Sequence, residues 1–193
     1  MIYTLGDYVK LLSEEKLVTY ENVDKNAAVE HISYNSRDVR PGTLFICKGA
    51  HFKAEYLADA EKAGAVCYVG EQRLGADFPC IIVSDVRRAI SLISNKFFDK
   101  PWEKLSLIGI TGTKGKSTTT YFMRYILDEY LKAVGKPRSG VISSIDTYDG
   151  VENFESHLTT PEPIELFRHF DNAVKSGIGY MTMEVSSQAL KYG

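Results

Sequence analysis

The stretch from Leu107 to Thr120, Leu-Ile-Gly-Ile-Thr-Gly-Thr-Lys-Gly-Lys-Ser-Thr-Thr-Thr, constrains the fold more than any other part of the chain. An apolar run over 105–110 ends in a glycine-rich turn, and a helical pattern follows at once. Gly112 and Gly115 let successive backbone N–H groups approach phosphate oxygens with no Cβ in the way, and the next helix presents its positive N-terminal end. Strand, turn and helix in this order predict a phosphate-binding loop.

The loop departs from the common pattern G-x-x-x-x-G-K-[ST], which needs glycine at position 110. This chain has Ile110 there, and Gly109 comes one place too early. The shorter form indicates a subgroup of phosphate-loop proteins, in which Lys116 reaches the terminal phosphates and the Ser117 hydroxyl binds Mg²⁺. The alternative is a plain strand–turn–helix connection, but the flanking strand and helix favour the phosphate loop.

Composition limits the class of protein. The 193 residues are 44% hydrophobic and 25% charged, which is typical of a globular protein with one large or two small domains. A net charge of -2 gives no electrostatic reason to expect nucleic acid or a membrane, so a phosphorylated small molecule is the better partner. The start lacks an export signal and no apolar run approaches about 18 residues, so we expect a cytoplasmic location. The cysteines at 47, 67 and 80 are expected to be buried thiols.

The first hundred residues alternate between helical and strand patterns, which predicts a small α/β domain. We expect helices over 5–13, 54–63 and 86–98, and strands over 29–34, 43–47, 65–69 and 80–83. The polar segment 99–103 contains proline and is the expected boundary, which gives domains 1–100 and 101–193.

The second half continues from the phosphate loop as the first part of a P-loop NTPase-like doubly wound sheet. The expected elements are a helix over 116–133, a strand-like stretch over 139–148 with a hairpin partner over 151–157, a helix opening at 159–162, a strand over 179–185 and a helix from 186. The first of these helices is expected to face inward with its apolar residues, Phe122, Met123, Ile126, Leu127, Tyr130 and Leu131. These strands are too few to complete a doubly wound sheet. We therefore expect a fragment of a longer protein.

Glu184 is the candidate metal ligand. It lies at the carboxyl end of a predicted strand, where ligands gather in such sheets, and could join Ser117 around one Mg²⁺. The alternative is a surface glutamate, but the apolar residues before it favour a buried carboxylate, which is costly without a partner.

Other polar residues carry weaker signals. Thr159 and Thr160 could hold an anionic group at a helix N-terminus or simply cap it. Ser36 and Arg37 could bind a phosphate, or Arg37 could pair with a nearby acid. The histidines show no metal-ligand spacing, so no metal is assigned to His31, His51, His157 and His169.

Several motifs together resemble the Mur ligase family. The second half carries Thr-Gly-Thr-Lys-Gly-Lys-Ser-Thr at 111–118, Leu-Thr-Thr-Pro-Glu at 158–162 and Met-Glu-Val-Ser-Ser at 183–187. The first half carries Ile-Ser-Tyr-Asn-Ser-Arg at 32–37, Pro-Gly-Thr-Leu-Phe at 41–45 and Lys-Gly at 48–49. Within the family, the chain most resembles the members that add the third residue of the peptidoglycan stem peptide.

The resemblance implies an ATP-dependent ligase of three domains, of which this chain holds the UDP-substrate-binding domain and the first part of the central ATP-binding domain. Such enzymes use Mg²⁺ and ATP to convert the carboxylate of UDP-MurNAc-L-Ala-D-Glu into an acyl phosphate, which an amino acid then attacks. A monomer is expected. The family's carbamylated lysine and third domain would lie beyond Gly193, so we expect the chain alone to be inactive.

The resemblance also implies roles for individual residues. Lys116 would be catalytic, Ser117 and Glu184 would hold Mg²⁺, and Tyr34 and Ser36 would contact the uridine nucleotide. ATP would lie against Gly112, Thr113, Lys114, Gly115, Lys116, Ser117 and Thr118, and the muramoyl peptide against Thr159, Thr160 and Ser186. Gln188 stands where the family often has histidine, so a metal or proton role is in doubt there.

Other readings stay open. A ligase for another stem residue or a folylpolyglutamate synthetase would share the loop, although the folate enzyme normally begins at the P-loop domain. A non-catalytic nucleotide-binding module would also keep it, but intact Lys116, Ser117 and Glu184 weigh against that reading. The sequence does not identify the third amino acid.

Overall fold

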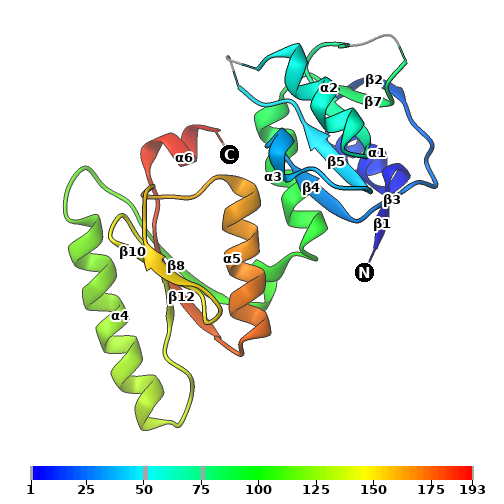
Figure 1. Cartoon of the computed structure of the whole chain (residues 1–193). Coiled ribbons are helices and arrows are strands. Elements are labelled where there is room, and N and C mark those ends of the chain that lie inside the picture. The colour runs from blue at the N-terminus through cyan, green and yellow to red at the C-terminus, as the bar shows by residue number, and fades with distance from the viewer. Residues whose placement is uncertain (1, 50–51, 75–76, 193) are drawn as a thin grey trace. The chain divides into compact units, whose positions relative to one another are not determined.

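The structure is a computed structural model that describes residues 2–49, 52–74 and 77–192. The chain forms two compact units, Met1–Phe97 and Phe98–Gly193 (Figure 1). The division falls beside the polar segment 99–103, which overlaps the short 3-10 helix η2, Pro101–Lys104.

The first unit is built on a five-stranded sheet. The strand order is β2-β7-β6-β5-β4, and all neighbours are parallel except β2 and β7. The strands are β2 (Val18–Asn22), β4 (His31–Ser33), β5 (Thr43–Ile46), β6 (Ala65–Gly70) and β7 (Cys80–Val83), with a separate antiparallel pair of β1 (Tyr3–Thr4) and β3 (Ala28–Val29). The helices are α1 (Leu5–Glu14), η1 (Ser36–Asp38), α2 (Ala54–Lys62) and α3 (Val86–Phe97).

The expected elements of this unit are present, but β1 and β2 lie in segments where no strand was expected, and one expected strand is divided. The expected strand over 29–34 is divided into β3 and β4, because Glu30 leaves the ladder and donates its N–H to Gly42 O at 2.9 Å. The core contains Phe45 and Tyr68, both fully buried. The three cysteines are buried and free, as expected, and burial raises the pKa of the Cys47 thiol to about 12.

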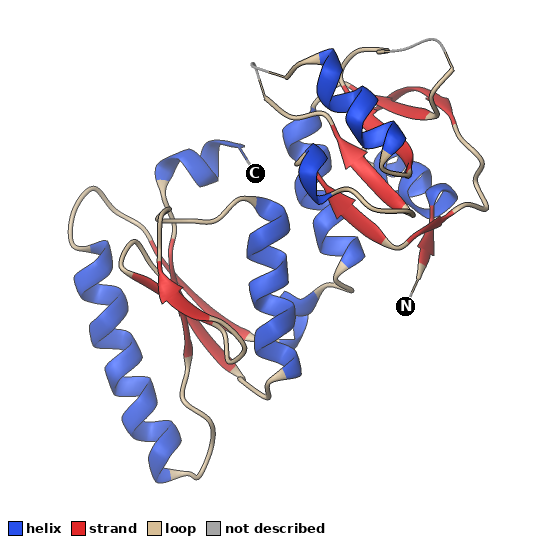
Figure 2. Cartoon of the chain, viewed as in Figure 1, coloured by secondary structure: helices blue, strands red, loops and turns tan. Residues whose placement is uncertain are grey.

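The second unit is a five-stranded mixed sheet with helices on both faces (Figure 2). The strand order is β11-β10-β9-β12-β8; β12 is parallel to both of its neighbours, and β10 is antiparallel to β9 and β11. The strands are β8 (Ser106–Ile110), β9 (Gly140–Ile142), β10 (Asp146–Tyr148), β11 (Asn153–Glu155) and β12 (Tyr180–Glu184). The helices are α4 (Lys116–Ala133), α5 (Pro163–Lys175) and α6 (Ser187–Tyr192).

The core of this unit lies between α5 and the sheet. Met181 and Met183 alternate along β12 and meet Phe170 and Ala173 of α5. Residues that alternate along a strand share one face of the sheet, and residues three or four apart share one face of a helix. One face of β12 therefore packs against one face of α5. This packing of a helix on a sheet is the α/β architecture expected from the sequence.

The expected strand over 139–148 is two strands, because the chain reverses at Ser143. The Ser143 hydroxyl accepts the N–H groups of Ile145 at 3.1 Å and Asp146 at 3.0 Å, which forms a serine turn between β9 and β10. Asp146 O in return accepts the Ser143 N–H at 3.0 Å.

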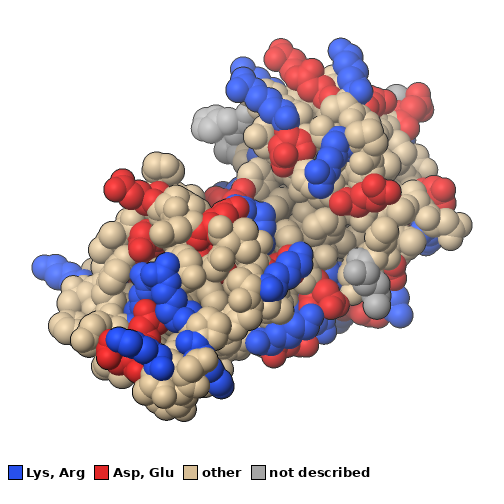
Figure 3. Space-filling model, turned by 60° about the horizontal axis from the view of Figure 1, so that its bottom comes forward, with Lys and Arg blue, Asp and Glu red and all other residues tan. Residues whose placement is uncertain are grey.

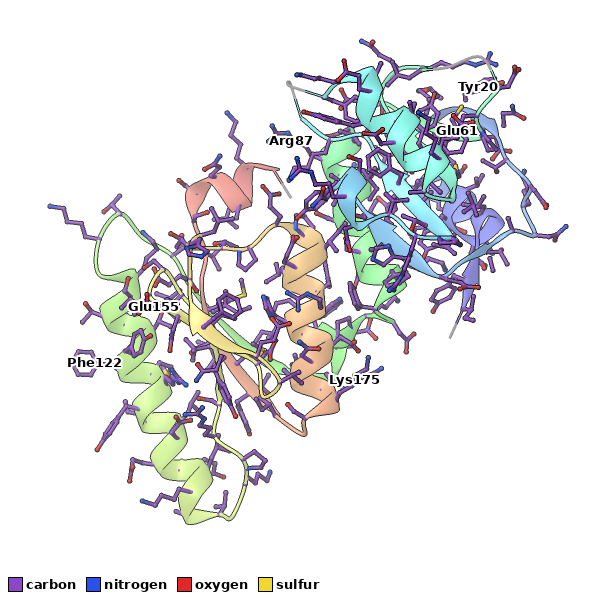
Figure 4. The ribbon with its side chains drawn as sticks, viewed as in Figure 1. Tyr20, Glu61, Arg87, Phe122, Glu155 and Lys175 are labelled. Atoms are coloured by element: carbon purple, nitrogen blue, oxygen red, sulfur yellow. The ribbon has the colours of Figure 1, made fainter. Side chains whose placement is uncertain are left out.

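The expectation for the apolar side of α4 is confirmed at Leu131 and wrong for Phe122, Ile126 and Tyr130. Its buried residues are Thr120 and Leu131, whereas Phe122, Ile126 and Tyr130 are 68%, 63% and 57% exposed. Met123 and Leu127 are only partly buried. Figure 4 shows Phe122 pointing away from the ribbon. The helical period is present, but in the described part of the chain Phe122, Ile126 and Tyr130 have no apolar surface to pack against.

Helix α5 begins later than expected. Its first residue is Pro163, and the Glu162 carbonyl accepts the Leu166 N–H at 2.8 Å. The X-Pro bonds at 160–161 and 162–163 disfavour helical conformation in the residues before them. Thr159 and Thr160 therefore precede the helix and do not cap it.

The displayed face of the protein mixes acidic and basic side chains (Figure 3), in line with the small net charge. Among the described residues, no helix is long and apolar enough to cross a membrane.

Candidate functional site

The phosphate loop joins β8 to α4. The chain leaves β8 at Ile110 and enters α4 at Lys116. Gly112 and Gly115 have φ angles of 149° and 77°, which disfavour any residue with a Cβ. The first N–H groups of a helix have no partner within it, so those of α4 are available to an anion at this loop.

Lys116 lies where the loop enters α4. Its Nζ donates to Gly112 O at 3.0 Å, so the side chain folds back across the loop that precedes it. The ammonium group lies beside the backbone that the glycines open to a phosphate. This position fits the contact with terminal phosphates expected of this lysine.

Glu184 lies at the same edge of the sheet as the loop. The parallel pairing of β12 with β8 sets Glu184 opposite Ile110, the last residue before the loop. The Glu184 residue is 1% exposed, and its Oε1 accepts the N–H and the hydroxyl of Ser144 at 3.0 and 3.1 Å. The Ser144 and Ser117 Oγ atoms lie 3.1 Å apart. Ser144 therefore links the two residues expected to hold Mg²⁺.

These groups fit a hard divalent cation. A hydroxyl from Ser117 and a carboxylate from Glu184 are oxygen ligands of the kind that Mg²⁺ prefers. In the described part of the chain, both hydrogen bonds to the Glu184 carboxylate come from the uncharged Ser144. A buried carboxylate without a cationic partner is costly, and a bound cation would remove that cost.

Thr160 and Ser186 hold the backbone beside Glu184. The Thr160 hydroxyl donates to Glu184 O at 2.9 Å and accepts the Ser186 N–H at 3.0 Å. The Ser186 hydroxyl accepts the Ala189 N–H at 3.1 Å, at the start of α6. Both hydroxyls thus have internal partners next to the loop. Gln188 is exposed on α6.

Tyr34 and Ser36 lie in the first unit, at the carboxyl end of β4. The adjacent parallel strand β5 leads to Lys48, whose Nζ is 4.7 Å from the centroid of the Tyr34 ring. Ser36 opens η1, where Asn35 Oδ1 accepts the Arg37 N–H at 3.0 Å. An aromatic ring and a cation therefore meet at a strand end, a frequent place for ligands in parallel sheets.

The comparisons with known proteins agree on one family. The profile of the Mur ligase middle domain matches residues 110–193. The UDP-N-acetylmuramoyl-L-alanyl-D-glutamate--L-lysine ligase of Streptococcus agalactiae serotype V is 44% identical over 171 residues, which is 88% of this chain and 34% of that protein. The UDP-N-acetylmuramyl-tripeptide synthetase of Lactobacillus acidophilus is 40% identical over 198 residues, 99% of this chain and 37% of that protein.

The chain belongs to the Mur ligase family. A solved UDP-N-acetylmuramoyl-L-alanyl-D-glutamate--2,6-diaminopimelate ligase has a TM-score of 0.73 at 20% identity and matches all of this chain over 38% of its own length. At this identity the likeness supports the Mur ligase fold alone. The chain spans about a third of the length of the curated relatives that it matches.

Ser144 is the residue of this Mur ligase site that the sequence reasoning missed. The pattern over 139–148 predicts a strand with Ser144 in its interior, where a serine has no special meaning. The signal was the Ser143-Ser144 pair directly after the apolar Val141 and Ile142, because serine favours turns at strand ends.

A second polar cluster in this Mur ligase chain comprises Asp149, Glu152 and His169, whose ligand atoms lie within 4.8 Å of one another. Asp149 Oδ1 accepts the N–H groups of Val151 at 2.9 Å and Glu152 at 2.7 Å. Its Oδ2 is 2.7 Å from His169 Nδ1 and accepts from Asn172 at 2.9 Å. Oδ1 therefore closes the β10–β11 turn, and Oδ2 joins that turn to α5. The sequence analysis assigns no metal to His51 either, and this residue lies outside the described residues.

Proposed function

We propose that the chain is the substrate-nucleotide and ATP-binding portion of a ligase that adds the third amino acid to UDP-MurNAc-L-Ala-D-Glu through an acyl phosphate. The observation that carries the proposal is the convergence of Lys116, Ser117 and Glu184 at one edge of the second sheet. The names of the relatives, which add L-lysine or build the tripeptide, support the choice of substrate.

Each residue has a defined part in the proposed site. The backbone from Gly112 to Thr118, with Thr113 and Lys114 between the glycines, would hold the ATP phosphates, and Lys116 would steady the transferred phosphoryl group. Ser117 and Glu184 would hold Mg²⁺, which when bound offsets the negative charge of the phosphates. Positioning and charge neutralisation of this kind account for most of the catalysis in phosphoryl transfer.

The substrate nucleotide is assigned to other residues. In the proposal, Tyr34 and Ser36 contact the uridine nucleotide, and Lys48 adds a cation for its phosphates. Thr159, Thr160 and Ser186 face the muramoyl peptide, although the Thr160 hydroxyl already bonds to the backbone of Glu184 and Ser186, and the Ser186 hydroxyl to the Ala189 N–H. Since the reaction consumes ATP and a UDP-linked substrate, the proposal includes a cytoplasmic location.

Nucleotide binding by this chain is the first test. Isothermal titration calorimetry with ADP in the presence of Mg²⁺ is expected to give saturable binding. Lys116→Ala is expected to lower the affinity for ADP by about 10- to 100-fold, because a phosphate contact is lost. Lys132→Ala is the matched control, because Lys132 lies in the last turn of the same helix. An equal loss in both variants, or no binding by the unaltered chain, would contradict the proposed ATP site.

Ligase chemistry is the second test. The chain is supplied with Mg²⁺, ATP, UDP-MurNAc-L-Ala-D-Glu and either L-lysine or meso-diaminopimelate, and ADP release and amide formation are measured. We expect no amide from the 193-residue chain and amide-coupled ADP release from a polypeptide of the relatives' full length that contains it. ATP binding without turnover by that longer polypeptide would favour a non-catalytic nucleotide-binding module.

A further inference from the structure

We propose that Ser144 is a positioning residue that orients the Ser117 hydroxyl and the Glu184 carboxylate toward a divalent cation. The inference rests on the proposed nucleotide site and adds to it a residue that does not itself bind the cation. It is carried by the hydrogen bonds that run from Ser117 through Ser144 to Glu184.

The position of Ser144 is fixed by its turn. The neighbouring Ser143 accepts two backbone N–H groups, from Ile145 and Asp146, and its own N–H is bonded to Asp146 O. The turn follows β9, which pairs in parallel with β12, the strand that ends at Glu184. The Ser144 N–H is thereby held 3.0 Å from Glu184 Oε1.

The direction of the hydroxyl hydrogen bonds follows from their chemistry. An ionised carboxylate only accepts, so the single Ser144 hydroxyl proton is donated to Glu184 Oε1. The Ser144 oxygen must then accept the proton of the Ser117 hydroxyl, 3.1 Å away. With that proton directed to Ser144, the Ser117 lone pairs are left to face a cation.

The same contacts differentiate the two oxygens of Glu184. Ser144 gives Oε1 two donors, and no other hydrogen bond to this carboxylate is found within the described residues. Oε2 is therefore the oxygen that Glu184 offers to a cation. Loss of the Ser144 hydroxyl would free Ser117 to rotate and donate its proton to the carboxylate, and both ligands would then be misdirected.

The test compares ADP affinity in Mg²⁺ with ADP affinity in EDTA, measured on the whole chain. Ser144→Ala is expected to lower the affinity in Mg²⁺ by about tenfold, as is typical when a group that orients a metal ligand is removed, and to leave the affinity in EDTA unchanged. Ser144→Thr keeps the hydroxyl and is expected to retain most of the Mg²⁺ effect. Ser106→Ala, at an exposed position of β8 in the same unit, is the control.

Ser144→Cys is a second variant that separates the loss of hydrogen bonds from misfolding, because cysteine keeps the shape of the side chain but forms only weak hydrogen bonds. It is expected to lose affinity as the alanine variant does. A Mg²⁺ effect of unaltered size in the alanine and cysteine variants would overturn the role of Ser144 and leave the nucleotide site intact. Equal losses in Mg²⁺ and EDTA would assign Ser144 a purely structural role. No ADP binding by the unaltered chain would overturn the nucleotide site itself, and this inference with it.

Discussion

His169 Nδ1 lies 2.7 Å from Asp149 Oδ2, and the two residues are 2% and 0% exposed. Asp149 begins the turn between β10 and β11, whereas His169 lies in the middle of α5. The contact therefore fastens the antiparallel edge of the second sheet to the helix that covers its core. The contribution of this contact to the free energy of unfolding can be measured separately from nucleotide binding.

Asp149→Asn is expected to lower the free energy of unfolding by about 2–3 kcal/mol, because an amide supplies one acceptor where four donors now meet a buried carboxylate. Urea denaturation at pH 7 measures this change. Asp171→Asn is the matched control: it breaks a pair with the exposed Lys175 on the same helix and should cost less than about 1 kcal/mol. Equal costs in the two variants would contradict the structural role of Asp149.

The contribution of Asp149 should depend on pH. Burial raises the pKa of Asp149, but hydrogen bonds from the Glu152 N–H, His169, Asn172 and the Val151 N–H outweigh it, so the pKa lies below its ordinary value. A lowered folded-state pKa gives stability that is complete above the unfolded value of about 3.9 and is lost as the pH falls through the folded value. The stability difference between the unaltered chain and Asp149→Asn should therefore shrink below about pH 4. A difference that stays constant down to pH 2 would contradict the lowered pKa.

Substitution of Gly150, in the same turn, is expected to destabilise the fold. The φ of Gly150 is 88°, and a Cβ there would lie 2.1 Å from Ser176 Oγ, which donates to Asp149 O. Gly150→Ala should cost about 2–3 kcal/mol, because backbone strain adds to a forced shift of a neighbouring group. Gly135→Ala carries only the strain of a φ of 68°, with nothing within 4 Å of the new Cβ, and should cost about 1 kcal/mol. Similar losses in urea denaturation would argue against the close contact with Ser176.

The phosphate loop and the strand that ends at Glu184 could be predicted because they depend on local patterns. Glycines that need positive φ and an apolar strand before a helix leave a signature within about ten residues. The turn at Ser143 could not be predicted in the same way. The apolar and polar residues over 139–148 fit one strand as well as two, and the reversal depends on two backbone N–H groups that donate to a single serine hydroxyl.

The orientation of α4 could not be predicted either, because a helical period shows that a stripe exists and not what covers it. Ile126 is 63% exposed and Leu131 is 2% exposed, although both were expected to face the core. In urea denaturation of this chain, Ile126→Ala should cost less than about 1 kcal/mol, whereas Leu131→Ala should cost about 2–4 kcal/mol because it leaves a cavity. A larger loss at Ile126 than at Leu131 would show that the stripe is packed in solution.

Glu184→Gln is expected to affect binding and stability in opposite directions. The glutamine oxygen can still accept from Ser144, so the turn at 143–146 should be kept, whereas the negative charge is lost. ADP affinity in Mg²⁺ should fall at least about tenfold, and the free energy of unfolding in EDTA should stay level or rise, because a buried charge without a cationic partner has been removed. Calorimetry and urea denaturation measure the two effects, with Glu155→Gln on the exposed strand β11 as the control. Unchanged Mg²⁺ dependence would remove Glu184 from the metal site, and a large loss of stability in EDTA would indicate that its charge supports the fold instead.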